Sequence, residues 1–273
     1  MSETRVTTPD LREERTLLRR GHALVAGMDE VGRGAWAGPV SVGVALVPAK
    51  ATKRTLPRWL RDSKQLSEAR RESIFESVGA WCADWAVGHA TPQECDRYGM
   101  RIALRLAAQR ALAGLHSPPD ALLVDGPLDL VSDPDAVPQP RRSAFRGAVH
   151  PVVGGDARCA SVAAASVLAK VVRDRLMRAE SEHFPAYSFE RNKGYPSPVH
   201  QMALRGYGLS SIHRRSWSYV AGLPWHGNGA EPAATGAEPS QTIDGLGQCG
   251  AEPWSDMAPE KPPRSVISKW PIP

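Results

Sequence analysis

The sequence predicts an α/β fold in which helices flank a mixed β-sheet. Residues 24–47 contain two apolar segments separated by a glycine-rich turn, which is the pattern of a β-hairpin. After this hairpin, segments with helix signals alternate with short apolar segments typical of strands. This order is typical of a sheet that contains both antiparallel and parallel strands and has helices packed on its faces.

The element boundaries follow from local signals. Ser67 is a suitable N-cap for a helix that runs to about Trp81. Thr91-Pro92-Gln93-Glu94 combines a capping threonine, a proline at the first helical position and a glutamate three residues after the cap, so a second helix starts there. We also expect strands at 84–90, 121–125 and 148–153, and a helix at 158–183 whose first half is rich in small residues.

The composition indicates one folded domain with extensions at both ends. The chain has 273 residues, of which 42% are hydrophobic and 23% are charged, enough for a sizeable core. We expect a charged N-terminal extension at 1–20, a folded domain at 21–220 and a disordered Pro/Gly-rich tail at 221–273. The Pro-rich segment 127–142 is expected to be a loop.

Nothing in the sequence indicates a membrane or secreted protein. No apolar run approaches the ~20 residues that span a bilayer, and the N-terminus has no apolar signal core. Four cysteines are far apart and form no CxxC pair, so we expect reduced thiols in a cytoplasmic protein rather than a zinc site. They are Cys82, Cys95, Cys159 and Cys249.

Positive charge is concentrated in the body of the chain. Of the 34 basic and 29 acidic residues, the tail holds three basic and six acidic ones, which leaves an excess of eight positive charges in residues 1–220. A basic body is compatible with a nucleic-acid partner, although many soluble proteins are basic.

Three aspartates lie close to glycine at the ends of apolar segments, and a glutamate follows the first of them. Carboxylates are rarely buried unless they are paired or hold a metal, and in open α/β sheets the functional crevice lies at strand ends. The set predicts a site for Mg²⁺ or Mn²⁺, in which two ions about 4 Å apart stabilise the attacking and leaving oxygens of a phosphodiester. For any one acid alone, a helix cap or an acidic surface turn is the alternative. The residues are Asp29, Glu30, Asp125 and Asp156.

The adjacent pair Asp29 and Glu30 poses a geometric problem. Neighbouring residues of a regular strand face opposite sides of the sheet. Both side chains can therefore reach one site only through a β-bulge or through the twist at the end of the strand.

Beyond these acids, the chain resembles the bacterial ribonuclease HII family, the type 2 branch of the ribonuclease H family. No single matching stretch is specific, but their order between about residues 24 and 217 is. The stretches are 27–34 with 37–40, 62–67, 124–126, 155–156, 161–174, 192–195, His200 and 212–216. The resemblance implies a ribonuclease H-like fold with a mixed central sheet flanked by helices and a small C-terminal helical part.

The resemblance also implies roles for individual residues. Gly32-Arg33-Gly34 is similar to the element that recognises the 2′-hydroxyl at an RNA–DNA junction, the one sugar group that separates the two polymers. Tyr195 is similar to the tyrosine that packs on the adjoining sugar, and Lys64 and Lys170 resemble residues that hold phosphates. The metal-binding and catalytic carboxylates fall on Asp29, Glu30, Asp125 and Asp156.

Further basic residues are candidates for contacts to the nucleic-acid backbone. His213 is expected to be structural. Many relatives have Lys-Gly-Asp where this chain has Gly154-Gly155-Asp156; the missing lysine weakens a phosphate contact or shifts metal affinity, but the acid is retained and activity should survive. The backbone-contact candidates are Arg191, Lys193, Arg205, Arg214 and Arg215.

The function implied by the resemblance is that of an endoribonuclease that depends on Mn²⁺ or Mg²⁺. Its partners would be RNA–DNA hybrids and duplex DNA with single ribonucleotides, cut on the 5′ side to leave a 3′-hydroxyl and a 5′-phosphate, in DNA replication and repair. We expect a monomer without a membrane partner. Two alternatives stay open: another nuclease on the same fold, and a non-catalytic hybrid-binding protein. The latter is disfavoured because clustered carboxylates repel one another without a metal.

Overall fold

The computed structural model describes residues 8–48, 56–126, 131 and 145–223. Its single sheet has the strand order β3-β2-β1-β4-β5. β1 pairs antiparallel with β2, as does β2 with β3, whereas β1–β4 and β4–β5 are parallel. The predicted mixed sheet is therefore confirmed. The strands are β1 (Val25–Val31), β2 (Val40–Leu46), β3 (Asp84–Ala90), β4 (Ala121–Asp125) and β5 (Ala148–Val152).

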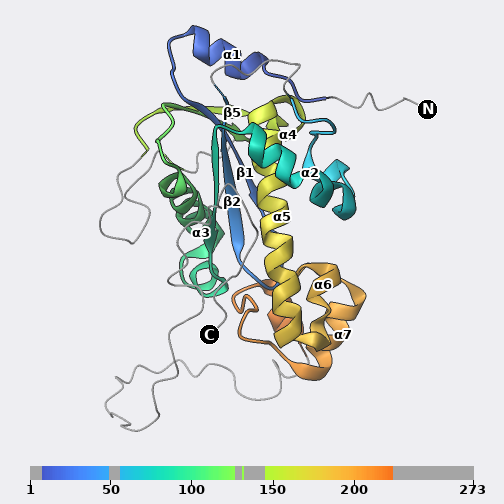
Figure 1. Cartoon of the computed structure of the whole chain (residues 1–273). Helices are drawn as coiled ribbons and strands as arrows, with labels where there is room; N and C mark the ends of the chain where they lie inside the picture. Colours follow the sequence, from blue (N-terminus) through green and yellow to red (C-terminus); the bar gives the residue numbers. More distant parts are fainter. Residues whose placement is uncertain (1–7, 49–55, 127–130, 132–144, 224–273) are drawn as a thin grey trace, which may run out of the picture.

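Helices cover both faces of this sheet (Figure 1). Helix α3 (Pro92–Gly114) packs on one face, and α5 (Ala160–His183) packs on the other together with α2 (Glu68–Trp81). A small helical part follows α5, as expected from the resemblance. The remaining helices are α1 (Arg12–Arg19), α4 (Gly155–Arg158), α6 (Phe189–Asn192) and α7 (Pro198–Tyr207), with 3₁₀ turns η2 (Ser63–Gln65), η4 (Pro185–Tyr187) and η5 (Ser218–Gly222).

The predicted helix starts are confirmed by their caps. The Ser67 hydroxyl accepts the N–H of Arg70 at the start of α2. At the start of α3, the Thr91 hydroxyl accepts the N–H of Glu94, and the Glu94 carboxylate accepts the N–H of Thr91. Two otherwise unsatisfied backbone donors are thereby paired.

Helix α5 lies unusually close to the sheet because small residues face each other across the interface. A Cβ atom at Gly27 of β1 would lie 2.2 Å from the backbone carbon of Ser161. A Cβ atom at Gly43 of β2 would lie 2.5 Å from the Ala165 carbonyl oxygen. This contact holds the first half of α5 directly beside the acidic residues of β1.

The N-terminal extension contributes a helix that packs on the body. Leu17 of α1 is buried in a cluster with Val25 and Val162, and the buried carboxylate of Glu14 accepts both the N–H and the hydroxyl of Ser161. Within the described residues, no helix is both long and apolar enough to cross a membrane. The expectations for the tail at 224–273 and for most of the loop at 127–142 lie outside the described residues.

Candidate active site

The first two acids lie in β1, which runs through them without a bulge. Asp29 pairs with Gly43 of β2 and Glu30 with Val42, in unbroken register. Asp29 is therefore on the α5 face, whereas Glu30 is on the α3 face. The parallel pairing of β1 with β4 ends at Met28, so Glu30 lies past the last residue of β1 that is paired with β4. Of the two explanations that the sequence leaves open, the bulge is wrong.

Asp29 is the most strongly perturbed acid of the site. Its side chain is nearly inaccessible to solvent, and this burial raises its pKa to about 7. The hydrogen bond with the Ser166 side chain lowers the pKa, whereas the negative charges of Glu30 and Asp125 raise it further. Burial also raises the pKa of Glu30, opposed by the guanidinium of Arg33 at 3.8 Å and helped by Asp125. The negative charge of Asp125 therefore raises the pKa of both Asp29 and Glu30.

Asp125 and Asp156 join the end of β4 to the start of α4. The Asp125 carboxylate accepts the N–H of Gly155 at 2.7 Å. Asp156, the next residue, is buried and accepts a bond from the Lys64 ammonium at 3.0 Å. Although burial opposes it, the bond to Asp156 and the nearby negative charges raise the pKa of Lys64.

A fifth acid, Asp62, belongs to the same neighbourhood. Burial and the charge of Asp156 raise its pKa, and its carboxylate accepts the backbone N–H of Lys64 at 2.8 Å. Asp62 belongs to the stretch 62–67 that resembles the family, but the resemblance implies no role for it. Its position two residues before a candidate lysine was the available signal.

The donor set suits a hard divalent cation. Carboxylate oxygens are the ligands that Mg²⁺ and Mn²⁺ prefer, and the charge of Lys64 is too small to neutralise the surrounding acids. Among the described residues, no three His, Cys, Asp or Glu side chains are already arranged as a metal-holding group. The Lys64 ammonium is instead the cation that contacts Asp156.

A glycine-rich loop adjoins the acids at the end of β1. The N–H of Gly32 donates to the Tyr195 hydroxyl at 3.1 Å. Gly32 has φ +85°, and a Cβ atom there would lie 2.3 Å from Arg173, so the fold requires glycine. Gly34 differs: its φ is not positive, and a Cβ atom there would meet nothing within 4 Å. Nothing within the described chain explains its missing side chain.

The predicted phosphate-binding Lys170 is brought close to Tyr195. Its ammonium lies 5.3 Å from the centre of the tyrosine ring and forms an ion pair with Asp174 at 2.8 Å. Lys170, Tyr195 and Gly32 thus form one continuous group of contacts, separate from the Lys64–Asp156 pair.

Two of the five predicted backbone-contact residues are buried, so their prediction is wrong. Arg214 is completely buried, and Lys193 is 4% exposed and paired with Glu68. Neither can reach a nucleic-acid backbone, because both side chains are buried and already bonded to other groups of the protein. His213 is structural as predicted: it is buried, and its Nε2 atom lies 2.9 Å from the Nε2 atom of His200. The other three candidates, Arg191, Arg205 and Arg215, are exposed.

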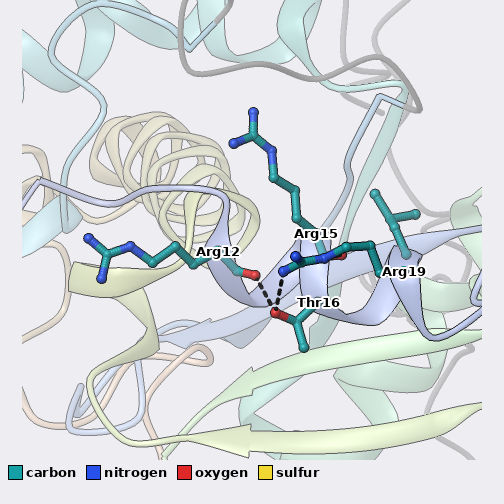
Figure 2. A pocket seen from close by; sticks show the side chains of 5 residues that line it. Arg12, Arg15, Thr16 and Arg19 are labelled. Carbon is teal, nitrogen blue, oxygen red and sulfur yellow. Dashed lines mark hydrogen bonds between the residues drawn. The ribbon is translucent and has the colours of Figure 1, made fainter.

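A shallow pocket on α1 is unrelated to the acids. Arg12, Arg15 and Arg19 extend from this single helix, and Figure 2 shows the Thr16 hydroxyl bonded to the Arg12 carbonyl and to the Arg19 guanidinium. The polar contacts between its lining residues are made within one helix, so we assign it no function.

Comparison with known proteins shows that the protein is a ribonuclease H enzyme. The structure is similar to ribonuclease H2 from Pyrococcus horikoshii OT3, with a TM-score of 0.59 and 29% identity over 72% of this chain and 94% of that one. It also shares its fold with Bst-RNase HIII in complex with Mn²⁺, with a TM-score of 0.56 and 22% identity over 71% of this chain and 67% of that one.

Sequence comparison narrows the class. The family model described as Ribonuclease HII matches residues 26–220, and the chain belongs to the ribonuclease HII family. It is 46% identical to ribonuclease HII of Paracoccus denitrificans over 78% of this chain and 93% of that protein. It is 44% identical to ribonuclease HII of Streptomyces avermitilis over 75% of this chain and 81% of that protein.

Proposed function

We propose that the protein hydrolyses the RNA strand of RNA–DNA hybrids and nicks duplex DNA on the 5′ side of single ribonucleotides, leaving a 3′-hydroxyl and a 5′-phosphate. The observation that carries this proposal is the position of the buried Asp29 beside a loop whose Gly34 has no explanation within the described chain. Asp29 would supply a carboxylate for metal-assisted hydrolysis at a phosphate, and the open space at Gly34 would leave room for a sugar against the backbone.

The carboxylates would hold the divalent metal, either Mn²⁺ or Mg²⁺. When bound, the metal would supply an activated water and neutralise charge at the phosphorus. Asp125 is held by the Gly155 N–H and Asp156 by Lys64, which orients both before metal arrives. Lys64 is 69% exposed in its side chain, so its ammonium can also reach a phosphate oxygen. The proposed ligands are Asp29, Glu30, Asp125 and Asp156.

Substrate selection would rest on the loop Gly32-Arg33-Gly34 and on Tyr195. The bond from the Gly32 N–H fixes the tyrosine hydroxyl, and the Lys170 ammonium supports the ring. A tyrosine held in this way presents a flat apolar surface on which a sugar can pack. Arg33 is exposed and near Glu30, where it can meet a phosphate of the bound strand.

The proposal includes a monomer that acts in the cytoplasm on nucleic acid, without a membrane partner. Three cysteines within the described residues are buried free thiols, which supports a reducing compartment. They are Cys82, Cys95 and Cys159.

The direct test is cleavage of a DNA duplex that carries one ribonucleotide, with Mn²⁺ or Mg²⁺, beside an all-DNA duplex and the Asp29→Asn variant. A single cut 5′ to the ribonucleotide, lost with EDTA and in the variant, is the expected result. Cleavage of the all-DNA duplex would favour another nuclease on this fold. Tight hybrid binding by folded protein without any cut would favour a binding protein.

Gly34→Ala tests whether the open space at Gly34 serves the substrate. We expect normal stability and a loss of at least about tenfold in kcat/KM, because one misplaced contact costs about 1.4 kcal/mol or more. Gly206→Ala is the matched control, since a Cβ atom there also meets nothing within 4 Å. Equal activity of the two variants would remove the proposed role of Gly34.

A further inference from the structure

Two arginines beneath the glycine-rich loop are buried without an acidic partner. Arg173 and Arg214 are both 0% exposed, and neither forms an ion pair with a carboxylate in the described part of the chain. Buried charges are normally paired because removal from water is costly. Here, all the acceptors are backbone carbonyl oxygens. Burial lowers the pKa of Arg214 to about 10, which leaves it charged at neutral pH.

Arg214 binds the carbonyl groups of the loop itself. It donates to the Gly32 carbonyl at 2.7 Å and to the Arg33 carbonyl at 3.0 Å. Its remaining bonds, at 3.0 and 3.1 Å, go to the carbonyl of Gly38 where the loop ends. One guanidinium thus spans the loop from its beginning to its end.

These bonds determine which way two peptide groups face. In a trans peptide the carbonyl of one residue and the N–H of the next point in opposite directions. Because the carbonyls of Gly32 and Arg33 point inward at Arg214, the N–H groups of Arg33 and Gly34 point outward. Both residues are exposed, and neither N–H has an acceptor among the described residues.

Other N–H groups of the loop are already occupied. Those of Trp36 and Ala37 donate to the Gly194 carbonyl, and that of Gly38 donates to Ile212. The N–H of Gly32 is bonded to Tyr195. The amides of Arg33 and Gly34 are therefore the ones available to a ligand, and they lie beside the open space over Gly34.

We propose that Arg214 is a positioning residue for ribonucleotide recognition, which presents the amides of Arg33 and Gly34 as paired donors to the ribose at the cleavage site. This inference rests on the proposed function. A 2′-hydroxyl oxygen accepts hydrogen bonds, and a positive charge behind the two carbonyls polarises the peptides and strengthens their donors. Arg173 supports the far end of the same loop through the carbonyls of Pro39 and Ala37.

The test compares Arg214→Lys with Arg110→Lys. Lysine keeps the charge at position 214 but cannot span three carbonyls. Arg110 also donates to a backbone carbonyl, that of His89, and pairs with Glu94 away from the loop, so its variant controls for lost stability. The readout is the ratio of kcat/KM on a single-ribonucleotide duplex to kcat/KM on a uniform RNA–DNA hybrid, with thermal unfolding measured in parallel.

We expect the ratio to fall at least about tenfold in Arg214→Lys and to stay unchanged in Arg110→Lys. A single-ribonucleotide duplex offers the protein only one ribose, whereas a continuous hybrid offers further ribose contacts that offset the loss of one. An unchanged ratio in a folded Arg214→Lys protein overturns the inference. If the wild type cuts the single-ribonucleotide duplex while this ratio is unchanged, the proposed function stands and only the role of Arg214 fails.

A second measurement needs no change at Arg214. The ¹⁵N-labelled Asp29→Asn protein is mixed with the single-ribonucleotide duplex or with its all-DNA counterpart, and backbone amide signals are followed by NMR. We expect the Arg33 and Gly34 amides to shift with the ribonucleotide duplex only. Equal shifts with both duplexes, or none with either, would also overturn the inference.

Discussion

Replacement of Asp29 by Asn should stabilise the metal-free protein while abolishing catalysis. Burial holds the pKa of Asp29 at about 7 in the folded chain, against 3.8 for the free group. Below pH 3.8 the carboxyl is protonated in both the folded and the unfolded state. Between pH 3.8 and 7 the folded state binds more protons, so the free energy of unfolding falls as the pH rises, and above pH 7 this loss is complete.

The size of the effect follows from the shift. About three pKa units at 1.36 kcal/mol each correspond to about 4 kcal/mol lost at pH 8. An asparagine carries no charge, and its amide oxygen can still accept the Glu30 N–H that Asp29 accepts at 2.8 Å. Because a buried amide keeps some desolvation cost, we expect Asp29→Asn to gain about 2–4 kcal/mol at pH 8.

The assay is urea unfolding in EDTA at pH 5 and pH 8, followed by the same titration with Mn²⁺. The gain should be larger at pH 8 than at pH 5, and Mn²⁺ should stabilise the wild type more than Asp29→Asn. Asp174→Asn is the control, because Asp174 is buried but paired with Lys170 and Arg71; its loss should destabilise the protein. If Asp29→Asn is no more stable than the wild type at pH 8, the account of the buried charge is wrong.

Three further predictions concern the framework. Thr91→Ala should lower the free energy of unfolding by about 1 kcal/mol through loss of its cap, more than Ser67→Ala, whose single bond is 3.3 Å long; equal losses in urea unfolding would contradict this. Gly27→Ala should yield little folded protein by circular dichroism, because its Cβ would meet the α5 backbone at 2.2 Å, whereas Gly206→Ala should fold normally. Burial lowers the pKa of His213 to about 3, so its neutral form stabilises the fold above pH 6.5 and this contribution is lost as the pH falls. His213→Asn should therefore flatten that decline by up to about 1.4 kcal/mol per pH unit between pH 6.5 and 4.5; an unchanged slope would show that the ring is not held neutral.

Local signals were sufficient to predict most elements of the fold. The cap at Thr91, the small residues of α5 and the apolar strand before Asp125 each depend on near neighbours in the chain, and the structure confirms all three elements. The kink in α3 at Gly99, with φ +76°, has no such neighbour signal beyond the glycine itself.

The environment of the charged residues was less predictable. Arg214 bonds to Gly32, which lies 182 positions away, and a basic residue in a basic segment is ordinarily a solvated one. The role of Lys64 in holding a phosphate stays a prediction, and the contact of its ammonium with Asp156 has no signal in the sequence around it. Such pairings depend on which loops the fold brings together, and the local sequence pattern around either residue does not indicate its distant partner.

The contact between Glu14 and Ser161 means that the folded domain includes residues of the N-terminal extension. No side chain of α5 itself caps its first turn, and the Glu14 carboxylate accepts the N–H of Ser161 there at 2.8 Å, a favourable position for negative charge. The family match starts only at residue 26, so an expression boundary placed at the start of that match would delete this interaction. A truncated chain would release the start of the helix that carries Ser166 to Asp29, and weak activity in it would report a trimmed N-terminus rather than a poor enzyme.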